Sequence, residues 1–120
     1  PPYMPVMGLR LDFLDRNFSI AYSADTSPSD SVVELASGVD LLIHESSFSA
    51  TLEPDQDPTF YFHSDARMAG QIAVRAGAKK LALVHLSRLH GDHRRVLTAE
   101  AAESFHGEIF VPDDGDVLKF

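Results

Sequence analysis

Val39-Asp40-Leu41-Leu42-Ile43-His44-Glu45-Ser46-Ser47-Phe48 is an apolar run that stops abruptly at a histidine and a carboxylate. Gly38 breaks the segment before it. Residues 41–43 follow one another without polar alternation, which is typical of a strand covered on both faces in an α/β protein. Because ligands of open α/β sheets gather at the carboxyl ends of strands, we expect His44 and Glu45 to lie at a functional site.

Two further apolar runs end in the same way. Ile20 to Ala24 lead into Asp25, and Leu81 to Val84 lead into His85. Any one of these polar residues is explained as well by a turn-capping aspartate or by a structural histidine of the core. The three predicted strand ends together favour a site at one edge of a sheet.

Length and composition narrow the class of protein. The chain has 120 residues, 44% of them hydrophobic, which predicts a single domain (1–120) with a real core. It has no cysteine, so a metal would be held by histidines and carboxylates, which favours zinc, manganese or iron. The net charge of −8 argues against a nucleic-acid or anionic-membrane surface formed by this chain alone. Without an apolar stretch of membrane-spanning length or a signal-type opening, we expect a cytoplasmic protein with no membrane partner.

The amino-terminal third predicts a hairpin followed by a helix. Residues 9–13 alternate between apolar and polar, and turn residues separate them from a second strand at 18–23. Ser27 is the expected helix cap, with Pro28 at the first helical position. Gly38 is expected to end this helix.

The remainder alternates helices and strands. Residues 53–58 are acidic and broken by prolines, so they predict a loop without regular structure that is able to cover a site. Residues 63–65 open an alanine-rich helix, capped by Ser64 or Asp65 and ended by Gly77. A helix at about 94–106 and a closing hairpin at 109–120 complete the order ββαβαβαββ, a layered α/β arrangement.

Four motifs in series resemble a known family. They are Ser23-Ala24-Asp25-Thr26, the run from Asp40 to Phe48, His63-Ser64-Asp65-Ala66, and Lys80-Leu81-Ala82-Leu83-Val84-His85-Leu86-Ser87. Together they resemble the carboxy-terminal half of a metallo-β-lactamase-fold hydrolase, most closely the ribonuclease Z, arylsulfatase and cyclic-nucleotide phosphodiesterase branch. The match covers nearly all of residues 8–120. It implies α/β structure, as one half of a four-layer αββα sandwich.

The resemblance also implies a site with two divalent metal ions, zinc first, with manganese or iron as alternatives. Asp25 is then the carboxylate that bridges both ions, and His85 is a ligand of the second. His63 stabilises the developing phosphate charge or protonates the leaving oxygen, and Glu45 orients it. This arrangement suits hydrolysis of phosphodiesters, either RNA 3′ processing or cyclic-nucleotide cleavage.

Four more residues receive supporting roles. His44 is expected to be structural or to lie behind the ligands, because the resemblance gives the sharper role to its neighbour. Thr26 and Ser87 are expected to support the site. His90 is expected near the mouth of the site, in a loop that follows the last metal histidine.

One departure bears on activity. The family's first metal motif, His-x-His-x-Asp-His, belongs upstream of every residue here. His90-Gly91-Asp92-His93 resembles its tail, but Arg88 stands where a histidine is required, so we favour a loop of the Ser-Arg-Tyr-Gly-Asp type at 87–92. The isolated chain is therefore expected to bind metal incompletely and to be inactive. Its expected partner is an amino-terminal half of the same fold or a second copy in a homodimer. The alternative is a degenerate, non-catalytic interaction or regulatory module of the same fold.

Overall fold

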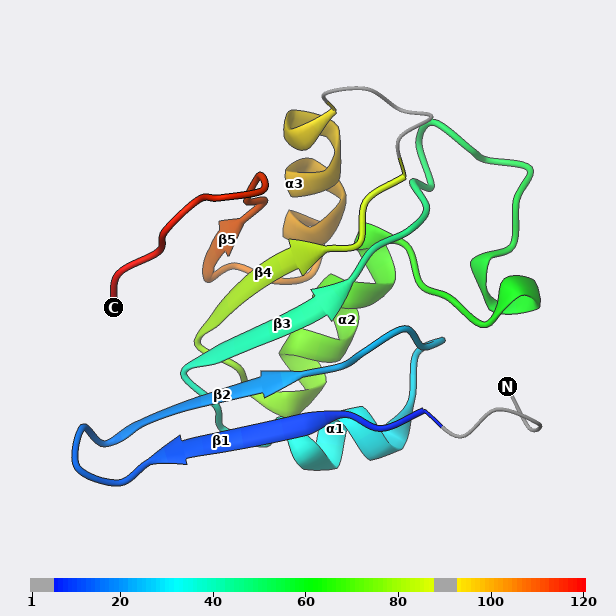
Figure 1. Ribbon diagram of the computed structural model, residues 1–120. Helices are drawn as coiled ribbons and strands as arrows, with labels where there is room; N and C mark the ends of the chain where they lie inside the picture. The colour runs from blue at the N-terminus through cyan, green and yellow to red at the C-terminus, as the bar shows by residue number, and fades with distance from the viewer. Residues whose placement is uncertain (1–5, 88–92) are drawn as a thin grey trace.

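A mixed sheet organises the chain. The computed structural model describes residues 6–87 and 93–120, and within them the strands form one sheet of order β1-β2-β3-β4-β5 (Figure 1). The strands are β1 (Leu9–Phe13), β2 (Phe18–Tyr22), β3 (Leu41–Glu45), β4 (Lys80–Val84) and β5 (Glu108–Phe110). β1 and β2 form an antiparallel hairpin, whereas β2 to β5 are parallel. The parallel strands therefore end at a common edge, where sites of open α/β sheets form.

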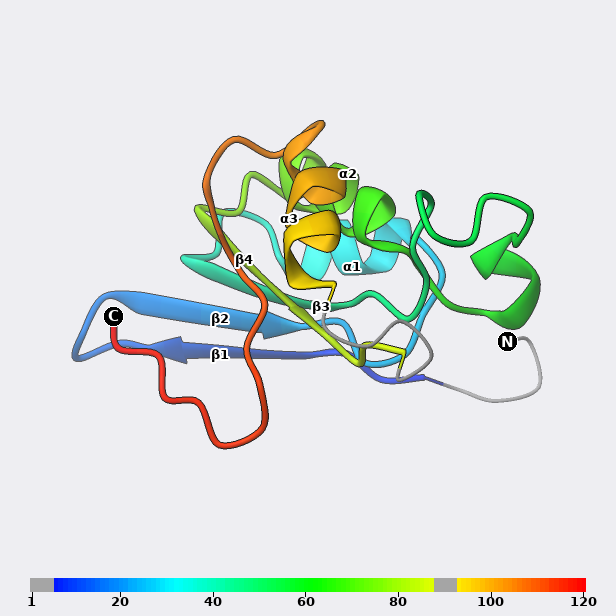
Figure 2. The same cartoon turned by 90° about the horizontal axis from the view of Figure 1, so that it is seen from above.

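One face of the sheet is covered by helices. They are α1 (Asp30–Leu35), α2 (Ala66–Ala76) and α3 (Arg94–Ala102), and they lie together on one side of the sheet (Figure 2). The core between the layers includes Ala21, Leu42, Leu81 and Leu83 from the strands and Ala69, Ile72 and Ala73 from α2. At Gly70 a Cβ atom would lie 2.4 Å from the carbonyl oxygen of Ala101, so the helix backbones touch there. Only glycine permits that approach.

The opposite face of the sheet is apolar and only partly covered. Leu9, Leu11 and Tyr22 point to this side and are exposed to solvent. The carboxy-terminal tail passes over the same side of the sheet (Figure 2). There the ring of Phe120 stacks on Phe18, with 5.6 Å between the ring centroids. The layers are thus helices, then sheet, then a largely bare apolar face, as expected for half of an αββα sandwich.

The structure confirms the α/β fold class and corrects three predicted elements. α1 begins at Asp30 with Ser29 as its cap, rather than with Ser27 as cap and Pro28 at the first position, because the side chain of Ser29 accepts a hydrogen bond from the Ser31 amide. Pro58, the last residue of the predicted loop, opens a short 3-10 helix, η1 (Pro58–Tyr61). The helix predicted to reach residue 106 ends at Ala102.

The predicted closing hairpin is also wrong. β5 pairs only with β4, and residues 117–120 form no strand, so the described order ends in one strand rather than two. A turn at Asp113–Asp116, in which the Asp116 amide donates to the Asp113 carbonyl at 3.1 Å, redirects the tail. The ring of Phe120 then packs on the sheet, stacked on Phe18 and edge-on to Phe110, instead of pairing along the sheet edge.

Among the helices of the described residues, none has the length and apolarity needed to cross a membrane.

Candidate active site

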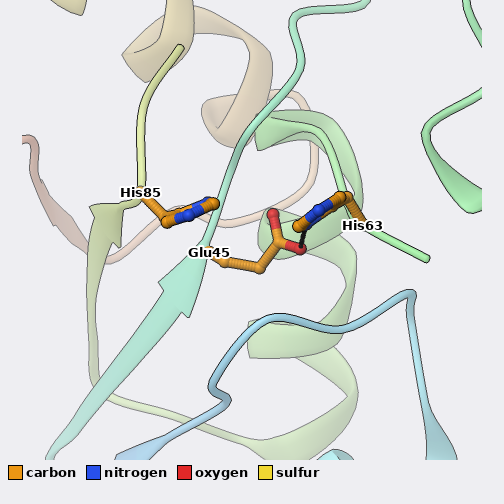
Figure 3. Close-up of side chains that lie close together, drawn as sticks. All are labelled: Glu45, His63 and His85. Carbon is orange, nitrogen blue, oxygen red and sulfur yellow. Dashed lines mark hydrogen bonds and ion pairs between the residues drawn. The ribbon is translucent and has the colours of Figure 1, made fainter. Parts of the chain in front are cut away.

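The carboxyl ends of the parallel strands and the start of α2 bring together three residues that the sequence singled out. Glu45 ends β3, His85 follows β4, and His63 lies just before α2 (Figure 3). Each offers one ligand atom, and these atoms lie within 4.8 Å of one another. The strand ends thus converge as the parallel topology requires.

Glu45 is the buried centre of this group. Its side chain is 0% exposed. Oε1 accepts hydrogen bonds from Nδ1 of His63 at 2.7 Å and from the Thr26 amide at 3.1 Å. Oε2 accepts from the amide and the hydroxyl of Ser47, at 3.0 and 2.9 Å. Every contact uses the carboxylate as acceptor, so four hydrogen bonds from the protein fix the position of the group.

Ser47 joins the two histidines, and the sequence analysis did not identify it. Its hydroxyl donates to Glu45, so the 2.7 Å contact between Oγ and Nδ1 of His85 is donated by the imidazole. This assignment makes Nε2 of His85 the unprotonated nitrogen. Such a fixed tautomer, with one nitrogen hydrogen-bonded and the other free, is the usual state of a metal-ligating histidine.

Asp25 faces that nitrogen. Oδ2 of Asp25 lies 3.6 Å from Nε2 of His85, and both side chains are about half exposed, at 49% and 51%. Two ligands at about 2.0 to 2.2 Å from one ion with tetrahedral geometry lie about 3.3 to 3.6 Å apart. The distance between Oδ2 of Asp25 and Nε2 of His85 therefore fits two ligands of one divalent ion, with further coordination positions open to other ligands.

The Glu45–His63 pair differs from the Asp25–His85 pair. At 2.7 Å its two atoms are too close to be ligands of one tetrahedral ion and instead form a direct, charge-assisted hydrogen bond. The His63 ring lies nearly parallel to that of His85, with centroids 5.6 Å apart and planes at 16°. The geometry thus separates a pair suited to metal binding from a pair suited to proton transfer.

The start of α2 fixes His63. Asp65 caps the helix by accepting the Met68 amide at 2.8 Å, and burial raises the pKa of Asp65. The hydroxyl of Ser64 donates to the Thr26 carbonyl at 2.6 Å. Thr26 therefore supports the site twice, because its amide also holds Glu45.

His44 does not reach this group. It alternates with Glu45 along β3 and points into the buried, helix-covered side. Its Nδ1 lies 2.8 Å from the backbone carbonyl of Glu45, and its Nε2 has no hydrogen-bond partner among the described residues. Burial lowers the pKa of His44, so the imidazole is neutral near pH 7.

Two predicted supporting residues remain. Ser87 lines a hollow of about 460 Å³ together with His63 and His85. His90 falls outside the described residues, as does most of the motif that resembles the tail of His-x-His-x-Asp-His.

Left-handed backbone conformations concentrate at the site. Among described non-glycine residues, positive φ occurs at Asn17 in the β1–β2 turn, at Ala24 (56°), at Phe62 (63°) and at His85 (59°). Ala24 precedes Asp25, and Phe62 precedes His63. Such conformations cost free energy and persist where the surrounding structure imposes them, often at functional sites. No sequence pattern revealed them.

A buried carboxylate of α3 anchors the segment after β3. Glu100 is 2% exposed. Its side chain accepts hydrogen bonds from the hydroxyl of Ser49 and from the amides of Ala50 and Thr51, the last two at 3.1 Å each. The segment that carries Ser47 is therefore tied to the last helix.

Curated relatives of this chain are ribonuclease Z proteins. The ribonuclease Z of Halorubrum lacusprofundi is 43% identical over 98 residues, which are 82% of this chain and 31% of that protein. That of Exiguobacterium sibiricum is 38% identical over 111 residues, which are 89% of this chain and 36% of that protein. The chain thus spans about a third of the length of these relatives. No protein-family model matches it.

Solved structures agree with the fold. The metallo-β-lactamase fold protein YhfI of Bacillus subtilis has a TM-score of 0.74 and 37% identity, covering 85% of this chain and 40% of that one. The short form of human tRNase Z has a TM-score of 0.67 over 93% of this chain and 37% of that one. Its 24% identity supports the fold alone.

Proposed function

We propose a function from the premise that this chain is part of a ribonuclease Z-like protein with the metallo-β-lactamase fold. The proposed function is hydrolysis of phosphodiesters with divalent metal ions, zinc first. In it, Asp25 and His85 are metal ligands, and Glu45 and His63 form a proton-transfer pair.

The difference between two distances carries this proposal. The 3.6 Å between Asp25 and His85 suits two ligands of one ion, and the 2.7 Å between Glu45 and His63 suits a hydrogen bond. A purely structural cluster of polar residues has no need for both arrangements side by side. A dinuclear hydrolase needs both, because metal ligands and a positioned acid act on the same phosphate.

Different residues of this chain have different roles in the proposed reaction. Bound divalent ions would supply Lewis-acid stabilisation of the phosphoryl oxygens and lower the pKa of water. His63 gives its Nδ1 proton to the hydrogen bond with Glu45, so its Nε2 is the atom that would pass a proton to the leaving oxygen. Glu45 fixes the ring and stabilises the imidazolium form. The Ser47 hydroxyl accepts the hydrogen bond from Nδ1 of His85 at 2.7 Å and lies 3.3 Å from Nδ1 of His63, between the two rings.

The activity is proposed to need an amino-terminal half of the same fold. Catalytic zinc sites commonly use three protein ligands per ion, and two ligands of this chain fall short of that number. The exposed apolar side chains on one face of the sheet are evidence for this need, because such a half would cover them. The proposed partner supplies His-x-His-x-Asp-His and covers that face.

The test uses a protein that joins this chain to an amino-terminal half with His-x-His-x-Asp-His. With zinc it should hydrolyse bis(p-nitrophenyl) phosphate, whereas the 120-residue chain alone should not. His63→Ala should lower kcat by about 10²- to 10⁴-fold and leave the zinc content unchanged. Asp25→Ala should lose zinc, and Asp30→Ala, at an exposed carboxylate paired with Arg75, is the matched control.

Two results would contradict the proposal. Loss of zinc in His63→Ala would mean that this histidine is a ligand. A joined protein that binds zinc without hydrolysing any phosphodiester would favour the alternative, a non-catalytic module of the same fold.

A further inference from the structure

The buried carboxylate of Glu100 holds the backbone that follows Ser47. Its oxygens accept hydrogen bonds from the hydroxyl of Ser49 and from the amides of Ala50 and Thr51. Burying a carboxylate costs free energy, and hydrogen bonds from the protein offset that cost only while they are kept. The three donors therefore fix where this backbone lies relative to α3.

The anchored backbone is a turn with hydrogen bonds of its own. The carbonyl of Ser49 accepts the amide of Glu53 at 2.8 Å, and the hydroxyl of Ser49 accepts the amide of Leu52 at 3.1 Å. These bonds make residues 49–53, here named the Ser49 turn, a single unit. Glu100 joins that unit to α3.

Close packing between two helices fixes Glu100 itself. The next residue, Ala101, lies against Gly70 of α2, where there is no room for a Cβ atom. The same helix α2 begins just after His63. Glu100 therefore holds the Ser49 turn in a fixed position relative to the helix that places one of the site histidines.

Ser47 lies between two anchors. On one side the amide of Ser46 donates to the carbonyl of Val84 at 2.8 Å, and on the other side the Ser49 turn begins. The Ser47 hydroxyl meets Nδ1 of His85 at 2.7 Å. A displacement of about 1 Å would lengthen this contact beyond hydrogen-bonding distance. The contact therefore depends on both anchors.

We propose that Glu100 is a positioning residue of the candidate site. Through the Ser49 turn it holds the Ser47 hydroxyl against Nδ1 of His85, and it thereby keeps Nε2 of His85 unprotonated. Its effect on metal binding rests on the proposed function, whereas its effect on the His85 ring is a property of this chain alone. If Glu100 were only a core anchor, its loss would lower stability and leave the ring unchanged.

The proton on His85 is measured first, in the metal-free 120-residue chain. Long-range proton–nitrogen NMR correlations at about pH 8.5, above the ordinary titration range of histidine, distinguish a proton on Nδ1 from one on Nε2. The parent chain should carry the proton on Nδ1. Glu100→Gln keeps the size of the side chain but turns an NH2 group toward at least one of the three donors. The form with the proton on Nε2 should then appear.

Two controls separate positioning from stability. Glu103→Gln makes the same substitution at an exposed carboxylate just after α3 and should leave the His85 proton on Nδ1. Val32→Ala, in the core on α1, should lower stability and also leave the proton on Nδ1. Circular dichroism checks that each variant is folded. If Glu100→Gln does not fold, Ser49→Ala, which removes one of the donors, should give the same change at His85.

Zinc affinity tests the path in the protein that carries both halves. Glu100→Gln should lower the affinity by about 10-fold, the lower end of the range for groups that orient metal ligands. In a Ser47→Ala background the same change should have no further effect, because the path to His85 is already broken.

Three results would overturn the inference. They are a parent chain with the His85 proton on Nε2, a folded Glu100→Gln chain that keeps the proton on Nδ1, and equal losses of zinc affinity with and without Ser47. A joined protein that binds no zinc would count against the proposed function instead, because the NMR measurement needs no metal.

Discussion

Oε1 of Glu45 lies 2.7 Å from Nδ1 of His63, although the two residues are 18 positions apart in the chain. Through its other oxygen the same carboxylate contacts the Ser47 hydroxyl, which meets Nδ1 of His85. One buried acid thus sets the orientation of both imidazole rings.

Replacing Glu45 by glutamine should show how much its negative charge contributes, because the shape of the side chain is kept. Glu45→Gln keeps the size of the side chain, but its NH2 group cannot accept the hydrogen bonds that one carboxylate oxygen accepts now. In the joined protein we expect kcat to fall by about 10²- to 10⁴-fold. Zinc content, measured by atomic absorption, should stay the same. Loss of zinc would show that Glu45 is itself a ligand.

Removing the hydroxyl that joins the rings should weaken metal binding. Ser47→Ala leaves Nδ1 of His85 without its 2.7 Å partner, so the tautomer with a free Nε2 is no longer favoured. We expect zinc affinity in the joined protein to fall by about 10- to 100-fold in a competition assay with a chelating dye. Ser47→Thr, which keeps the hydroxyl, should restore it. An unchanged affinity in Ser47→Ala would contradict the assigned network.

The left-handed backbone at Ala24 should limit stability. Ala24→Gly removes the steric cost of φ 56° and adds the entropy cost of glycine, for a net gain of about 0.5 to 1 kcal/mol in the free energy of unfolding. Ala102→Gly, at an exposed helical position, should cost about 0.5 to 1 kcal/mol. Urea denaturation measures both. A loss of stability in Ala24→Gly would mean that its methyl group matters more than its backbone.

The buried His44 should make stability fall with acid. Burial lowers its pKa below the ordinary value of 6.5, so below about pH 6.5 the unfolded chain binds a proton that the folded chain excludes. The contribution of this group is constant above that pH, and the free energy of unfolding decreases as the pH falls below it. Urea denaturation at about pH 7.5 and about pH 5.5 should show the decrease, with a smaller one in His44→Gln. His106→Gln, at an exposed histidine, should behave like the parent.

The bare face of the sheet should make the isolated chain self-associate. Leu9, Leu11 and Tyr22 form an exposed apolar surface that a second copy is able to cover. Leu11→Lys should reduce association in sedimentation velocity at micromolar concentration. Leu14→Lys, at an exposed leucine of the β1–β2 turn, should not. A stable monomer that binds no hydrophobic dye would mean that the face is already covered.

The sequence allowed the fold class and the convergence of three strand ends to be predicted, because both follow from local patterns. The unbroken apolar run of β3 and the Asp65 cap of α2 are examples. Ser47 was visible two positions after Glu45, but its role depends on His85, 38 positions away. The course of the tail depends on Phe120 meeting Phe18 across the sheet. Contacts of this range leave no periodic signal in the sequence.

The anchoring of Ser49, Ala50 and Thr51 by Glu100 has a consequence for local unfolding. These hydrogen bonds span 49 to 51 positions, so each of them requires α3 to be in place. We expect the segment that carries Ser47 to lose its anchor whenever α3 opens. The amides of Ala50 and Thr51 should therefore exchange hydrogen for deuterium together with those of α3, as one cooperative unit.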